Sequence, residues 1–230
     1  MLSRRANTVA AFGFAVVVVA TLVPATPARA QSSGAYVTAG GGFANRQRSG
    51  EDAFTYIDFG NDFAVNVAGG YLYQDEEKRA RNLSVEGEFS YLRNNTNTVS
   101  SVVTGPQAGL GNVALRVGMA NVRYEIPIPS ATFGAYVAGG IGGYKSYLNN
   151  VSNVVAQPFG FVANSASQGV TFAFQLRAGA QFRLAPRADL LAGYRYLHGG
   201  DLTFLGTAFG DLRPSGARIH SFEAALRVRF

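Results

Sequence analysis

The chain has 230 residues and no cysteine, so an exported form would have to be stable without disulfide bonds. Lys and Arg outnumber Asp and Glu by 20 to 14, but the first thirty residues supply three of the basic side chains and no acidic one. The remaining 17 basic and 14 acidic residues leave a charge of only +3. Such a small excess gives weak support for a nucleic-acid partner, and we expect none.

Residues 1–30 have the layout of a secretory signal peptide. A basic start precedes an apolar run over residues 9–23, and Ala28-Arg29-Ala30 forms a small-x-small cleavage site before Gln31. The apolar run is shorter than the ~20 residues that a membrane-spanning helix needs. We therefore predict a cleaved signal peptide at 1–30 and one exported domain at 31–230.

The rest of the chain alternates apolar and polar residues with a period of two, which is typical of strands whose two faces meet different surroundings. Eight such strands are predicted, each close to the 9–11 residues that cross a bilayer at a tilt. Their ranges are 35–46, 63–73, 83–91, 113–125, 133–143, 172–184, 190–196 and 222–230.

The strand at 113–125 changes its alternation halfway. Its first half has apolar residues at odd positions, such as Val117, whereas its second half has them at even positions, such as Val122. One extra residue near Gly118 and Met119 would keep the apolar residues on one face, so we predict a β-bulge there.

The connections between the predicted strands alternate in length. Long ones span 47–62, 93–112, 145–169 and 198–217, and short ones span 74–82, 126–132 and 185–187. All long connections then lie at one end of the sheet, as in outer-membrane barrels with long external loops and short periplasmic turns. The predicted fold is all-β: an eight-stranded antiparallel up-and-down transmembrane β-barrel, preceded by the cleavable signal peptide.

Charged residues on the lumen-facing side of the strands predict an ionic layer inside the barrel. Its members are Glu86, Glu88, Arg177, Arg195 and Glu223. An unpaired buried charge would cost several kcal/mol, so we expect carboxylates and guanidiniums to pair there.

Further arginines lie nearer the rim with the short turns and predict a basic excess at that end: Arg123, Arg183, Arg227 and Arg229. Two interpretations remain open. The lumen could be an anion-preferring pore for small solutes, or it could be filled and purely structural. Eight strands enclose an interior narrow enough for side chains to fill, which favours the filled lumen.

The residues offer little for catalysis. His220 adjoins Ser221, but neighbouring strand residues point to opposite faces, so the two cannot form a base and nucleophile pair. We predict no catalytic, cofactor-binding or metal-binding residue and no enzymatic activity. A lipid-modifying enzyme of the outer membrane is the least favoured alternative.

The last strand ends the chain on an aromatic residue. Its alternating residues Phe222, Leu226, Val228 and Phe230 would face lipid. A terminal Phe after an alternating strand looks like the assembly signal that the outer-membrane insertion machinery reads, so that machinery is a predicted partner.

Several segments are similar to the opacity-protein-like surface antigens, an eight-stranded barrel family of Gram-negative outer membranes. They are VEGEFSY (85–91), MANVRYEI (119–126), AYVAGGIGGY (135–144), FQLRAGAQFRL (174–184), DLLAGYRY (189–196) and HSFEAALRVRF (220–230). The resemblance implies an outer-membrane location, contact with outer-membrane lipid and surface loops that meet a host or environmental ligand. It implies neither a cofactor nor a catalytic residue. We therefore expect a surface protein with structural and antigen- or adhesin-like roles.

Overall fold

A computed structural model describes residues 33–50, 56–73, 82–101, 105–126, 128, 132–153, 162–167, 169–207, 210–212 and 215–230. No helix in these ranges is long and apolar enough to cross a membrane. The predicted signal peptide at 1–30 lies outside the described residues and stays a prediction.

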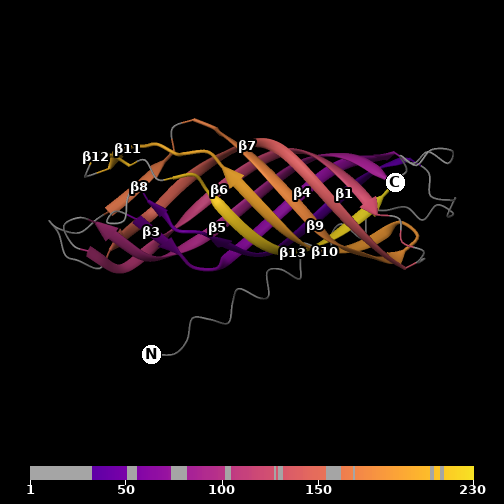
Figure 1. The fold of residues 1–230 in the computed structure, drawn as a ribbon, viewed down its shortest axis with the longest axis horizontal. Helices are drawn as coiled ribbons and strands as arrows, with labels where there is room; N and C mark the ends of the chain where they lie inside the picture. The colour runs from indigo at the N-terminus through magenta and orange to yellow at the C-terminus, as the bar shows by residue number, and fades with distance from the viewer. Residues whose placement is uncertain are drawn as a thin grey trace, which may run out of the picture.

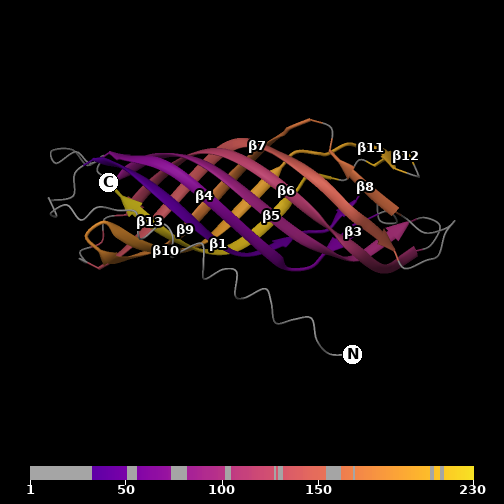
Figure 2. The ribbon, with the colours of Figure 1, turned by 180° about the vertical axis from the view of Figure 1, so that it is seen from behind.

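Eight long strands close into one antiparallel barrel within the described ranges, which Figures 1 and 2 show from two sides. They are β1 (Gly34–Arg46), β4 (Asp62–Tyr73), β5 (Leu83–Ser101), β6 (Gly105–Ile126), β7 (Phe133–Asn153), β9 (Thr171–Ala185), β10 (Ala188–Gly199) and β13 (Arg218–Arg229). Each pairs with the next in the chain, and β13 pairs with β1. The predicted eight-stranded barrel is confirmed.

Short strands are added at the end of the barrel that carries the long connections, on the left of Figure 1. They are β2 (Ser49–Gly50), β3 (Tyr56–Phe59), β8 (Val162–Ala166), β11 (Phe204–Thr207) and β12 (Gly210–Leu212). β3 pairs with β5 and β8 pairs with β7, so both lengthen the barrel wall. β11 and β12 pair with each other, and a single bridge between Ser167 and Phe204 joins them to this wall.

The pairing register sets the dimensions of the barrel. Following Cα partners around the wall from Ala44 leads back to β1 at Gly34, a stagger of 10 residues. With eight strands ~4.8 Å apart and a rise of ~3.3 Å per residue, this stagger tilts the strands by about 40°. Each residue then rises about 2.5 Å along the barrel axis, and the wall is about 16 Å across between backbones. Side chains can fill so narrow an interior.

Three neighbouring strands are much longer than the predicted 9–11 residues. β5, β6 and β7 contain 19, 22 and 21 residues, whereas β4, β10 and β13 contain 12 each. The longer strands rise roughly 50 Å, about twice the ~25 Å apolar band of an outer-membrane barrel. The predicted loop at 93–112 is therefore wrong over most of its length, and much of the loop at 145–169 is also strand, because these segments pair with one another beyond the membrane.

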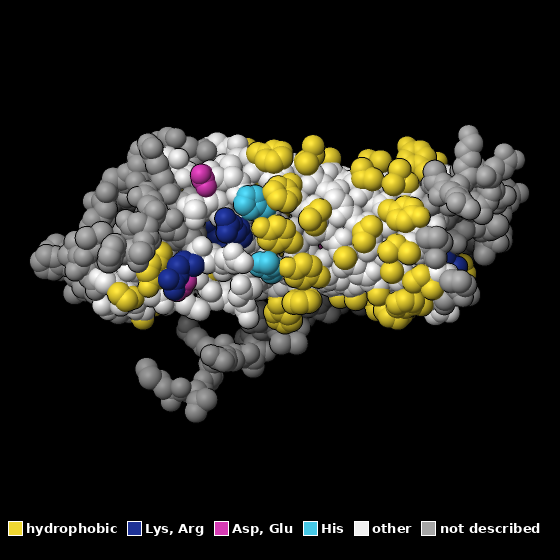
Figure 3. Space-filling model, viewed as in Figure 1, with side chains coloured by type: hydrophobic (Ala, Val, Ile, Leu, Met, Phe, Trp, Pro, Cys, Tyr) yellow, Lys and Arg dark blue, Asp and Glu magenta, His cyan; other side chains and the backbone are white. Residues whose placement is uncertain are grey.

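The outer surface carries a belt of apolar side chains, drawn yellow in Figure 3. Its members come from every strand of the barrel and are exposed despite their size, for example Phe43, Phe172, Leu176 and Phe222. Aromatic rings lie close together at one edge, as in the Phe133–Phe182 pair, and at the other, as in the Tyr194–Phe222 pair. An apolar belt edged by aromatic rings is the lipid-facing surface of a membrane barrel.

The predicted β-bulge at Gly118 and Met119 is wrong. β6 pairs with β5 and β7 in unbroken register from residue 113 to residue 124, and its register shift lies farther out, between Leu110 and Asn112. Odd-numbered side chains of β6 point inward throughout this stretch. The alternation changes because the polarity of the lumen changes with height, and the backbone continues without an insertion.

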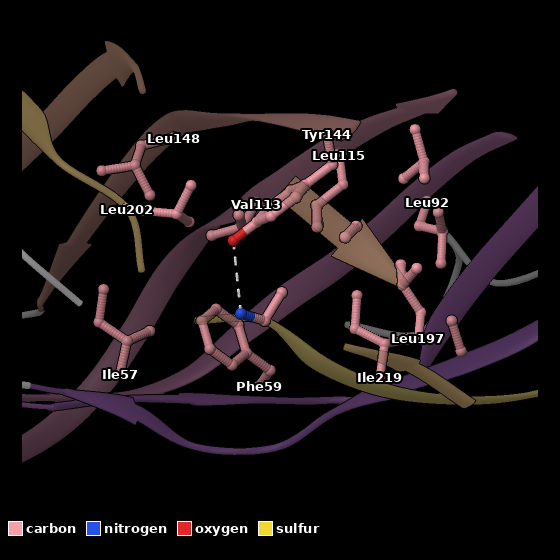
Figure 4. Close-up of a cluster of buried hydrophobic side chains, with 14 of the residues drawn as sticks. Ile57, Phe59, Leu92, Val113, Leu115, Tyr144, Leu148, Leu197, Leu202 and Ile219 are labelled. Atoms are coloured by element: carbon pink, nitrogen blue, oxygen red, sulfur yellow. Dashed lines mark hydrogen bonds between the residues drawn. The ribbon is translucent and has the colours of Figure 1, made fainter. Parts of the chain in front are cut away.

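The outer half of the lumen is mainly apolar, although it also buries the side chain of Arg46. A cluster of buried residues from all eight barrel strands fills it, and Ile57, Phe59 and Phe204 add to it from the short strands, as Figure 4 shows in part. Tyr144 crosses this region and donates a hydrogen bond to the carbonyl oxygen of Gly200 over 2.5 Å. The barrel end is therefore closed by a hydrophobic core of the kind found in water-soluble β-barrels.

Candidate functional site

The middle of the lumen contains an ionic network centred on Glu88. This side chain points inward from β5 and is 5% exposed. Arg177 approaches its carboxylate to 2.8 Å and Arg195 to 2.7 Å, from β9 and β10 on the opposite wall. The two carboxylate oxygens therefore join three strands across the barrel.

The other predicted members of the layer join the same network. Glu223 lies 3.2 Å from Arg195 and 3.7 Å from Arg177. Glu86 lies 3.9 Å from Arg177, and Arg123 approaches it to 3.0 Å. The three carboxylates and three guanidiniums balance, so the network is neutral.

Neutral polar side chains donate further hydrogen bonds to the three carboxylates. Glu88 accepts hydrogen bonds from Ser90, Asn121 and Gln175, at 2.6, 3.0 and 3.1 Å. Glu223 accepts hydrogen bonds from Asn66 and Ser221, at 3.0 and 2.8 Å. The Tyr36 hydroxyl donates to Glu86 over 2.7 Å. Buried charges with this many partners are retained at far lower cost than isolated ones.

The predicted basic excess near the short-turn rim is wrong for three of its four arginines. Arg123 belongs to the middle network, where its guanidinium also lies 4.6 Å from the ring centre of Tyr136. Arg227 pairs with Glu125 and Asp189, and Arg229 pairs with Asp189. Among these four arginines, Arg183 alone takes part in no ion pair within the described residues.

Sequence reasoning missed the two carboxylates of this lower network for different reasons. Asp189 lies directly before Leu190, where the predicted strand began, so the prediction left it out although β10 starts at Ala188. Glu125 shares its face with Arg123, as the two-residue spacing indicates. Counting every polar residue on the inner face, strand ends included, would have identified both.

The lumen is filled by these side chains. Arg123, Arg195 and Arg227 are 0%, 1% and 0% exposed, although each carries a charge. Glycines make room for large neighbours: a Cβ atom on Gly70 would lie 2.6 Å from the ring of Tyr36, and one on Gly193 would lie 2.6 Å from the hydroxyl of Tyr136. A water-filled channel would leave such arginines exposed, and this interior does not.

The residues considered for catalysis lie apart. Ser221 points into the lumen and donates its hydroxyl hydrogen bond to Glu223. His220 points outward, where it contacts the Tyr194 hydroxyl and lies 3.0 Å from the Gln47 side chain. Within the described residues, no group of three or more His, Cys, Asp and Glu side chains could hold a metal ion.

The residues of the predicted assembly signal differ in exposure. Phe222 and Phe230 are 69% and 62% exposed, and Leu226 is half-buried. Val228 is buried. Their role in insertion stays a prediction.

An ion pair joins the segment before β2 to β3 above the barrel. Arg48 donates two hydrogen bonds of 2.7 Å to the carboxylate of Asp58, and its guanidinium lies 4.0 Å from the ring centre of Tyr56. The hydrogen bonds that Arg48 donates to Asp58 raise the pKa of the Arg48 guanidinium above its usual value. This exposed pair lies outside the membrane-spanning part of the wall.

A closed antiparallel barrel with an apolar outer belt, a polar lumen and long connections at one end is an integral β-barrel of the bacterial outer membrane. Residues 15–230 match the model of the family described as outer membrane protein beta-barrel domain, and the chain belongs to that family. The protein is accordingly located in the outer membrane of a Gram-negative bacterium.

Solved structures share this fold at low sequence identity. Neisserial surface protein A (NspA) is 17% identical, with a TM-score of 0.55 over 87% of this chain and 100% of its own. The outer membrane protein OprG from Pseudomonas aeruginosa is 14% identical, with a TM-score of 0.53 over 87% of this chain and 97% of its own. No curated protein sequence matches the chain.

Proposed function

We propose that this protein is a non-conducting surface protein of the outer membrane, whose extended strands and loops meet host or environmental partners. The observation that carries the proposal is the burial of Arg123, Arg195 and Arg227 inside the barrel. A lumen packed tightly enough to enclose charged side chains leaves no path for water or small solutes.

The extracellular end supports an interaction role. β5, β6 and β7 carry the wall beyond the apolar belt, and β3 and β8 pair with this extension. The apolar cluster beneath holds this extension in one arrangement. A rigid scaffold that presents connecting segments to the medium is the usual architecture of a binding surface.

The proposal includes no catalytic step. Ser221 has its hydroxyl committed to Glu223 inside the lumen, and His220 is on the outer surface. The nucleophile and base that a hydrolase needs within hydrogen-bond reach are therefore on opposite sides of the wall.

Planar-bilayer recording of the purified protein tests the closed lumen. We expect no stable channel conductance from the wild-type protein. Persistent openings under the same conditions would contradict the proposal and favour the small-solute pore.

Single-cysteine variants test the extracellular extension, because the chain has no cysteine of its own. Asn95→Cys lies on an exposed part of β5 beyond the belt, and Arg187→Cys lies in the short turn at the other end. A membrane-impermeant maleimide should label the Asn95 variant on intact cells and the Arg187 variant only after lysis. Labelling of both on intact cells, or of neither, would contradict this arrangement.

A further inference from the structure

The outer surface of the barrel wall carries a group of polar side chains where β5, β6 and β7 leave the apolar belt. Cα partners across these strands place Arg116 beside both Tyr91 and Lys145, and Asn112 beside both Asn95 and Asn149. We call this group the outer-rim patch; its members are Tyr91, Arg93, Asn95, Asn112, Arg116, Lys145, Tyr147 and Asn149. All of these residues share the outward-facing side of their strands with the belt.

The height of the patch matches the level of lipid headgroups. Arg93 is ten residues beyond Leu83 at the start of β5, and Arg116 is ten residues from Ile126 at the opposite end of β6. Ten residues rise about 25 Å along the axis, which equals the height of the apolar band of an outer-membrane barrel. The cations therefore lie at the boundary between hydrocarbon and the outer headgroup layer.

The positive charge of the patch is poorly neutralised by the protein. Arg116 and Lys145 lie directly opposite each other on paired strands, an arrangement of like charges that disfavours folding. Neither makes an ion pair within the part of the chain that the structure describes, and Arg93 has one carboxylate nearby, Asp62 at 3.4 Å. The patch keeps a net positive charge that an external anion could balance.

Tyr147 positions the two cations. The Arg116 guanidinium lies 4.8 Å from the centre of its ring, and the Lys145 ammonium lies 5.9 Å from it. Both positive groups are thus held near the same aromatic ring, with their remaining hydrogen-bond donors available to an acceptor. A phosphate group is the compact, strongly charged acceptor that suits a neighbouring Arg and Lys.

The amides beside the cations suit a sugar. Asn149 donates a hydrogen bond to the Asn112 side chain over 3.0 Å, and Asn95 is exposed next to Asn112. Amide side chains donate and accept, as sugar hydroxyls do. A simple phospholipid would use only the cations and leave these amides without a counterpart.

We propose that the outer-rim patch binds the phosphorylated sugar headgroup of a glycolipid in the outer leaflet of the membrane. Arg116 and Lys145 hold the phosphate, Tyr147 orients them, and the asparagines contact the sugar. The site is on the outside of the wall and is separate from the lumen, so it holds whether or not the barrel conducts.

Native mass spectrometry of the detergent-purified protein, titrated with lipid A, tests this site. The double variant Arg116→Gln/Lys145→Gln should bind lipid A at least about tenfold more weakly, since each cation near an anionic lipid surface adds appreciably to the binding free energy. The matched control Arg183→Gln/Arg187→Gln removes the same charge at the short-turn end and should bind within about twofold of wild type. Equal binding by wild type and the double variant, or equal loss in both variants, would overturn the proposal.

Two further titrations test whether the patch recognises the whole glycolipid headgroup, a phosphate group alone, or any negatively charged lipid. Inorganic phosphate alone should bind weakly, and binding as tight as that of lipid A would reassign the patch to free phosphate. Phosphatidylglycerol should bind more weakly than lipid A, and equal binding would remove the sugar from the proposal. Heat-modifiable gel migration checks that each variant folds, and the single variant Lys145→Gln replaces the double variant if that one does not.

Discussion

Replacing Glu88 with Gln should destabilise the barrel more than any loss of a surface charge. The substitution keeps the size of the side chain and removes the negative charge that Arg177 and Arg195 share at 2.8 and 2.7 Å. Both guanidiniums stay buried, with Glu223 at 3.7 and 3.2 Å as a remaining partner. The middle network would then carry one uncompensated positive charge.

The expected cost follows from the number of contacts that weaken. Each charge-assisted hydrogen bond contributes roughly 1.5–3 kcal/mol, and removing one partner of a buried pair costs about 3–5 kcal/mol. Because Glu223 keeps part of the attraction, we expect Glu88→Gln to lower the free energy of unfolding by about 3–4 kcal/mol. With an m-value of about 2–3 kcal/mol per molar urea, the midpoint should fall by roughly 1–2 M.

Urea unfolding in detergent micelles measures this shift. Because the chain has no tryptophan for fluorescence, unfolding is followed by circular dichroism and by migration of unheated samples on a gel. The control is Asp58→Asn, which removes an equal charge from the exposed pair with Arg48 and should move the midpoint far less. A second substitution, Glu88→Gln/Arg195→Gln, restores neutrality and should regain part of the loss. A midpoint for Glu88→Gln that equals that of Asp58→Asn would refute the idea that the network stabilises the lumen.

Two further predictions concern the apolar end and the last strand. Leu115→Ala leaves a cavity in the apolar cluster and should lower the free energy of unfolding by about 2–5 kcal/mol, measured by the same urea titration; a change below that of the exposed Leu110→Ala would contradict the packed core. Deleting Phe230 should reduce the heat-modifiable protein in outer-membrane fractions of cells, whereas Phe43→Ala, which removes another exposed ring, should not. Equal amounts of heat-modifiable protein for the deletion variant and the wild type would contradict a role of the terminal residue in assembly.

The sequence alone predicts those parts of the fold that depend on the alternation of apolar and polar residues along a strand. Residues 172–184 alternate without interruption, and β9 runs from Thr171 to Ala185. The lumen residues Arg177 and Glu223 were predictable for the same reason, since a period of two assigns every residue of a strand to a face. Opposite charges enclosed in a narrow barrel must pair, so their contact also follows from the pattern.

Strand ends and heights were harder to predict. β5 continues through Asn94-Asn95-Thr96-Asn97, a stretch whose asparagines have low strand propensity, because β6 and β3 pair with it there. That pairing is a tertiary contact that local sequence does not encode. The same limit hid Asp189, because β10 begins at Ala188, two residues before the predicted start at Leu190.

The misplaced bulge has a physical meaning. Within the membrane, β6 turns Val122 and Tyr124 toward lipid and Asn121 and Arg123 toward the lumen. Above the membrane the same strand meets water on its outer side, so Arg116 faces out and the apolar side chains must turn inward to form a core. The strand therefore exchanges the polarity of its two faces without any change of backbone. An exchange of this kind in an unbroken strand marks the height at which the wall leaves the lipid, and in β6 it falls next to Arg116, where the outer-rim patch begins. The apolar core above that height and the ionic network below it thus follow from one requirement. At each level, the side chains on the outer face must suit lipid or water, and the side chains of opposite polarity are buried in the lumen.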